Sequence, residues 1–201
     1  AAGLTITSAG AITLDATTGG IDGAGALTLN AQDGVNLNDN ISTTAGAFVI
    51  DADTDNAVSN ADADNISLLA GATITAGGSL TLNATSGSII GAGAATFTVL
   101  DGFTLGTDLT TAGATVINAD SNNDGVGLFT LTGGFTISTT NNTLSVTAAD
   151  MALAGTIDSG TNTTTLLVSN GGTIDLGATS GALDLSNTEL QTIKASVLIN
   201  D

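Results

Sequence analysis

The sequence predicts an all-β chain wound as a β-solenoid of about twelve coils, and three observations lead to this fold class. A short pattern recurs along the 201 residues: two apolar residues flank a small polar one, then Asp, Asn, Ser or Thr follows, and Gly precedes the next apolar pair. A longer repeat, in which whole groups of these copies recur, is superimposed on the short one. The composition, with 27 Gly, no Pro and 2% aromatic residues, departs from that of ordinary globular chains.

The short pattern is typical of a strand, a turn and a second strand. Residues 27–37, LTLNAQDGVNL, are its clearest copy. Copies follow one another at a mean interval of about 17 residues, which is typical of one coil of a solenoid. The polar residue that follows the strand, such as Asp15 or Asn30, is expected at a recurrent corner. The second apolar residue of each copy is, in order, Leu14, Leu29, Ile50, Leu68, Leu82, Val99, Ile117, Leu131, Val146, Val168, Leu185 and Ile199.

The longer repeat groups the short copies in fours. Residues 5–25 match residues 73–93 at a constant offset. We therefore expect three super-repeats of four coils, roughly residues 1–70, 71–135 and 136–201, within a single domain of residues 1–201 that no linker interrupts. The chain begins and ends within the pattern, so we expect either a segment of a longer chain or a subunit that stacks end to end on neighbouring subunits.

Alternation of period two predicts which side chains face the interior. Leu27 and Leu29 are expected inside, and the Thr residues between apolar positions outside. Two blocks of similar sequence are FTVLDGFTL, which begins at Phe97, and FTLTGGFTI, which begins at Phe129. Their similarity predicts equivalent interior positions two coils apart for Phe97 with Phe129 and for Phe103 with Phe135. A helical turn is expected only within residues 187–194.

Charge and composition exclude several classes of function. The formal net charge is −18, with one Lys or Arg against 19 Asp or Glu, so we expect neither nucleic acid nor anionic lipid as a partner. No apolar run reaches the length of a membrane helix, and no membrane insertion is expected. His, Cys and Tyr are absent, which leaves carboxylates as the only general acids and bases; we expect no enzyme.

The repeats GAITLDA, GALTLNA and GSLTLNA resemble those of filamentous haemagglutinin-type adhesins and related giant bacterial surface proteins. Residues 188–201, TELQTIKASVLIND, are similar to a recurring block of these proteins. The resemblance covers nearly the whole chain and implies a right-handed parallel β-helix that serves as a secreted stalk or fibre.

These observations predict a structural, non-catalytic segment of a secreted bacterial surface fibre or adhesin, located outside the cell or on its surface. One alternative is an extracellular filament subunit that assembles by itself through its open ends. Another is a module that binds a carbohydrate or a cell-surface receptor through Asn, Asp and Thr side chains.

Two acidic segments are candidate calcium sites, although no cofactor is required by the predicted fold. Asp120, Asn122 and Asp124 fit the first half of a calcium loop, D-x-N-x-D-G, in which alternate oxygens converge on the ion. The Glu that such a loop carries at its twelfth position is replaced by Leu131. A related set of acidic residues, Asp51, Asp53 and Asp55, lies at the equivalent place one super-repeat earlier, and a second set inside an insertion consists of Asn60, Asp62 and Asp64. Solvated acidic loops without an ion are the alternative.

Overall fold

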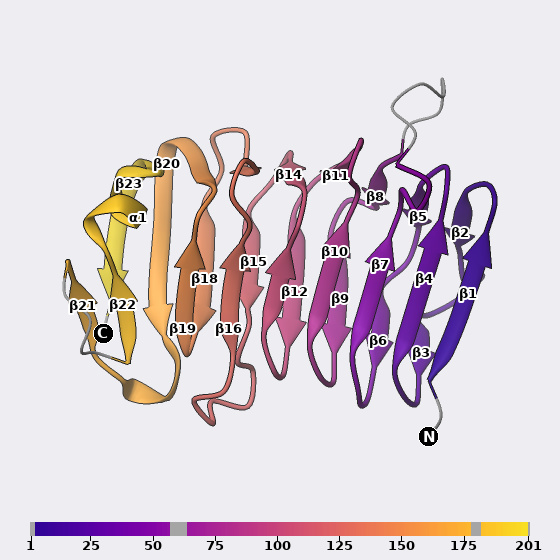
Figure 1. The fold of residues 1–201 in the computed structure, drawn as a ribbon, viewed down its shortest axis with the longest axis horizontal. Helices are drawn as coiled ribbons and strands as arrows, with labels where there is room; N and C mark the ends of the chain where they lie inside the picture. The colour runs from indigo at the N-terminus through magenta and orange to yellow at the C-terminus, as the bar shows by residue number, and fades with distance from the viewer. Residues whose placement is uncertain (1–2, 57–63, 178–181, 201) are drawn as a thin grey trace.

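The computed structural model describes residues 3–56, 64–177 and 182–200, and it is an all-β solenoid of parallel strands (Figure 1). Seven of the strands form one sheet, which we call face A. They are β1 (Leu4–Ser8), β4 (Leu27–Ala31), β7 (Phe48–Asp51), β10 (Leu80–Asn83), β13 (Phe103–Leu105), β16 (Leu128–Leu131) and β19 (Asp150–Leu153).

Two further stacks, faces B and C, are joined into one sheet by the long strand β20 (Thr156–Val168). Face B contains β2 (Ile12–Leu14), β5 (Val35–Leu37), β8 (Ile66–Leu68), β11 (Ser88–Gly91), β14 (Asp108–Thr111) and β17 (Thr136–Ser138). Face C contains β3 (Ile21–Gly23), β6 (Ile41–Thr43), β9 (Ala72–Ala76), β12 (Ala95–Val99), β15 (Thr115–Asn118) and β18 (Leu144–Ala148). The chain visits A, B and C in turn, so three strands close one coil.

The expected coil length is not confirmed by the strand register. Leu4 pairs with Leu27, and the chain between them passes through all three faces, so one coil is longer than one copy of the short pattern. Face A contains seven strands in the described residues, not twelve. The reason is that every corner uses the same kinds of turn residue, so the sequence pattern marks strands without showing how many of them close a coil.

The longer sequence repeat moves each strand to a different face. At the offset of this repeat, the sequence of β1 in face A matches that of β9 in face C, and the sequence of β2 in face B matches that of β10 in face A. In the sheet, Thr5 instead pairs with Thr28. The offset corresponds to eight strands, which is one strand short of three complete coils. The super-repeats of the sequence therefore do not coincide with structural units.

The interior is filled by columns of Leu, Ile, Val and Phe, as the alternation predicts. Leu27, Leu29 and Phe103 are buried. The expected Phe pairs are wrong: Phe97 lies in face C and pairs with Ile117, whereas Phe129 lies in face A and pairs in register with Phe103 on the adjacent strand. Phe135 is half-buried and lies outside the strands. The aromatic column arises because β13 and β16 are neighbours in face A. The offset between the two similar sequence blocks does not show which strands are neighbours.

Asn and Asp side chains bridge neighbouring coils at the corners, where the backbone ladder stops. Asn40 Oδ1 accepts a hydrogen bond from the Thr73 N–H (2.8 Å), and Asn65 Oδ1 accepts one from the Ser88 N–H (2.8 Å). Each such bond satisfies a backbone donor that has no strand partner. Asn40 and Asn65 are not the residues for which the sequence predicted corners. Of those, Asp15 follows β2, but Asn30 lies within β4 and stacks in register on Asp51 of β7, so the prediction is wrong for these two strands.

The last coil departs from the regular pattern. After β20 come a 3-10 turn at Ser169–Gly171, β21 (Ile174–Leu176), which pairs with β22 (Leu183–Leu185), then helix α1 (Asn187–Gln191) and β23 (Ile193–Asn200), which pairs with β20. The expected helical turn is confirmed by α1, which a capping box of Ser186 and Glu189 begins.

Glu189 also ties α1 to the preceding coil, because its Oε1 accepts a hydrogen bond from the Leu153 N–H (3.0 Å). Partial burial raises the pKa of Glu189. Hydrogen bonds from the Leu153 N–H and from Ser186 outweigh this effect and hold the pKa below its ordinary value.

Candidate functional site

The loop that follows β15 is organised around the carboxylate of Asp120, which is fully buried. Its Oδ1 accepts a hydrogen bond from the Asp124 N–H (3.2 Å), and its Oδ2 accepts one from the Gly125 N–H (3.0 Å). The Ser169 hydroxyl, from the turn after β20, donates to Oδ2 as well. Asp120 therefore anchors its own loop and connects it to the turn after β20, which lies two strands further along face C.

Asn122 and Asp124 are exposed on the outside of the same loop. The Asn122 side-chain amide donates to Asp124 Oδ2 (2.8 Å), and the Val126 N–H donates to Asp124 Oδ1 (2.8 Å). Every carboxylate oxygen of Asp120 and Asp124 thus accepts a hydrogen bond from the chain. Calcium binding by this loop stays a prediction, and these bonds account for the loop's shape by themselves.

The earlier acidic segment is divided between the surface and the interior. Asp51 is half-buried in β7, in register between Asn30 and Asn83. Asp55 is exposed, whereas Asp53 and Asp64 are buried. Two members of the second set, Asn60 and Asp62, lie outside the described residues. Within the described ranges, no three acidic side chains are arranged so that they could hold a metal ion.

The burial of Asp53 and Asp64 is the feature that the sequence interpretation missed. Asp53 stands in the motif IDAD, and Asp120 stands in the matching INAD. In both motifs the residue before the final Asp is a buried Ala, and the final Asp turns inward at the corner. The shared motif was therefore the available signal that Asp53 and Asp120 differ from the other acidic residues.

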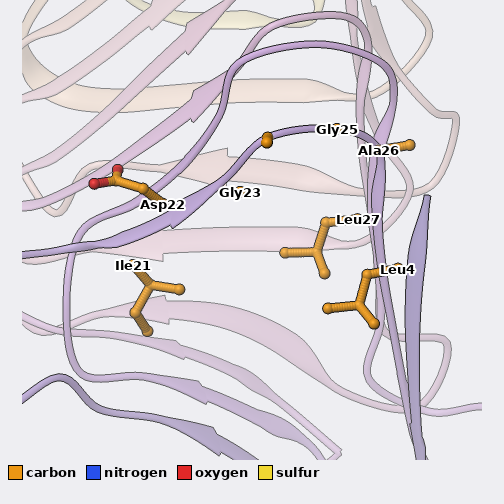
Figure 2. A pocket seen from close by; sticks show the side chains of 8 residues that line it. Leu4, Ile21, Asp22, Gly23, Gly25, Ala26 and Leu27 are labelled. Carbon is orange, nitrogen blue, oxygen red and sulfur yellow. The ribbon is translucent and has the colours of Figure 1, made fainter. Parts of the chain in front are cut away.

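The hollow shown in Figure 2 lies beside the first coil and has a volume of about 210 Å³. The side chains of Leu4, Ile21 and Leu27 gather around it. Asp22, at its rim, accepts a hydrogen bond from the Ser42 hydroxyl. The hollow thus offers an apolar surface and no set of polar groups arranged for catalysis.

Hydroxyl-bearing side chains form columns on the outside of the sheets. On face C, Thr73 pairs with Thr96, and Thr75 pairs with Thr98. The aromatic rings that would stack on a sugar are mostly inside: Phe48, Phe97, Phe103 and Phe129 are all fully buried. A carbohydrate would therefore be bound mainly through hydroxyl and amide groups.

The chain matches no protein-family model, no curated protein and no solved structure. Among the described residues, no helix has the length and apolar character needed to cross a membrane.

Proposed function

We propose that the chain is a structural, non-catalytic segment of a secreted bacterial surface fibre or adhesin, with an extracellular or cell-surface location. The observation that carries this proposal is the continuous interior. From Ile12 to Leu185, buried apolar side chains form one core that extends through successive coils. A coil that buries its apolar face against similar neighbours can be repeated along an axis, which is the property required of a stalk.

The proposal includes a right-handed winding and about eight coils. In Figure 1 the strands of face A run upward in front while the chain advances from right to left, which supports the right-handed sense. For the count, β22 contacts β19, and the Asp184 N–H donates to Asp150 Oδ1 (3.3 Å), which supports counting β22 as an eighth strand beside face A. Eight coils at about 4.8 Å would make a segment about 38 Å long.

Immunogold labelling of intact cells that produce the protein tests this function. We expect label on the cell surface and on material that extends from it. Gold particles inside lysed cells only, with none on intact cells, would exclude a surface fibre.

A filament subunit is the second candidate, and the first coil is the observation that favours it. Strands β1, β2 and β3 each have a partner strand on one side only in the described residues, and Leu4 is 58% exposed. A second copy could continue these sheets by parallel pairing. Against this candidate, α1 and β21 interrupt the regular coil at the other end. Sedimentation velocity at rising concentration separates the two, because a filament subunit would form larger species and a segment would stay monomeric.

Binding of a glycan or a cell-surface receptor is a third candidate, supported by the Thr columns of face C. A glycan array is the corresponding measurement. Specific signals that disappear when Thr75 and Thr98 are replaced by Val would support this candidate, and an array without signals would remove it.

A further inference from the structure

We propose that the corner between β7 and β8 binds a hard divalent cation, for which Ca²⁺ is the ion to test. The ligands in the described residues are the carboxylates of Asp53 and Asp64. We call this place the Asp53–Asp64 corner. The ion is thus proposed at the Asp53–Asp64 corner and not in the loop of Asp120.

The backbone brings the two Asp residues into one corner of the solenoid. On one side, the Ala52 carbonyl accepts a hydrogen bond from the Gly34 N–H (3.0 Å), and the Asn65 carbonyl accepts one from the Val35 N–H (2.9 Å). The chain therefore leaves the corner just after Ala52 and returns to it just before Asn65. Asp53 and Asp64 are the residues at these two points.

The next coil covers both residues with a single turn. Asp53 Oδ2 accepts a hydrogen bond from the Ser86 N–H (2.6 Å). The carbonyl oxygen of Asp64 lies 2.2 Å from the position that a Cβ on Gly87 would occupy. Because Ser86 and Gly87 are consecutive, Asp53 and Asp64 lie under the same turn.

Burial makes an ionised Asp53 carboxylate at this corner costly unless a positive charge is near. Asp53 is 1% exposed and Asp64 is 5% exposed. Removing an ionised carboxylate from water costs several kcal/mol when it is not paired. The single basic side chain, Lys194, is in register with Asp158 in the last coil and cannot serve here.

A second observation is the state of Asp53 Oδ1, which is buried and has no hydrogen-bond partner among the described residues. Asp120, the final Asp of the matching INAD motif, is equally buried, but both of its oxygens accept hydrogen bonds. Buried polar atoms are nearly always satisfied. The difference indicates that Asp53 Oδ1 has a partner of another kind, and a cation fits a carboxylate oxygen best.

The donor set suits calcium. Calcium takes six to eight oxygen ligands from carboxylates, backbone carbonyls and water, in flexible geometry, so three carboxylates are not required.

Calorimetric titration and thermal unfolding with Ca²⁺ or EDTA test the proposal. For the wild type we expect binding in the range of about 10⁻⁴ to 10⁻³ M, which is typical of extracellular calcium modules. At a calcium concentration about ten times Kd, the melting temperature should rise by about 3–6 °C. Asp53→Asn should abolish both the heat and the shift. Asp124→Asn removes the same formal charge from the other acidic loop, and it should keep both.

No heat with wild-type protein up to about 10 mM Ca²⁺, or retention of the calcium response in Asp53→Asn, would overturn the proposal. Loss of the response in Asp124→Asn would return the ion to the Asp120 loop and equally overturn it. If Asp53→Asn does not fold, the backbone amide resonances of wild-type protein decide: calcium should shift those of Ser86 and Gly87 and leave that of Gly125 unchanged.

Discussion

Replacing Phe103 with Ala should be among the most destabilising single changes in the chain. Its ring is fully buried, and it lies between Phe97 (ring centroids 5.2 Å apart) and Phe129 (5.7 Å apart). Truncation of a buried Phe to Ala costs about 3–5 kcal/mol, and each aromatic pair contributes about 0.5–1.5 kcal/mol beyond its buried area. With two such pairs lost, we expect the upper part of that range, about 4–5 kcal/mol.

Thermal unfolding followed by far-ultraviolet circular dichroism measures this effect. A chain of this size loses about 2–4 °C per kcal/mol, so the melting temperature should fall by about 8–20 °C. The control is Thr104→Ala, one residue further along β13, where the side chain faces outward and is half-buried. That change should cost less than about 1 kcal/mol. Melting temperatures within about 2 °C of each other for Phe103→Ala and Thr104→Ala would refute the assignment of inside and outside.

Three further predictions concern the turns and the last coil. Gly87→Ala should destabilise the protein by more than about 2 kcal/mol in urea unfolding, because its Cβ would lie 2.2 Å from the Asp64 carbonyl oxygen, whereas Gly133→Ala, with its nearest contact at 3.6 Å, should be nearly neutral. Asp120→Ala removes the acceptor of the Asp124 and Gly125 N–H groups and of the Ser169 hydroxyl, so limited proteolysis should begin to cut its loop; an uncut loop would contradict the anchoring role. The pKa of Glu189 is lower in the folded state, so the stability that this residue contributes is present above its ordinary value of 4.5 and is lost as pH falls through the folded pKa. The difference in melting temperature between wild type and Glu189→Gln should accordingly shrink on acidification below that value, and a constant difference would show that the carboxylate charge has no part in it.

The strands and their inward faces could be predicted from the sequence because both depend on local rules. Alternation of period two places Leu27 and Leu29 inside and Thr28 outside, whichever strand lies beside β4. The bridges that Asn40 and Asn65 make to a backbone N–H of the adjacent coil were not predicted, because they depend on which strand lies beside the corner. The helical turn of α1 follows from a capping box that is also local.

The candidate site could be predicted only as a set of acidic residues. Asp51, Asp53 and Asp55 look equivalent in the sequence, yet Asp53 alone is buried, because the turn of the next coil closes over it. Asp64 is buried under the same turn, at the other end of an insertion. Which carboxylate loses its water depends on the neighbouring coil, and alternation along one strand contains no information about that neighbour.

The sequence by itself determined that this chain is made of strands with apolar inner and polar outer faces, separated by corners of Asn, Asp and Gly. The tertiary structure alone decided that three strands close a coil, so that Leu4 pairs with Leu27 and the longer sequence repeat moves from one face to another. The physical reason is that a strand's local preferences are satisfied equally well on any face. The number of strands per coil is set by hydrogen bonds and packing between segments of successive coils, such as β1 and β4, which are distant in the sequence and which local patterns do not relate to one another.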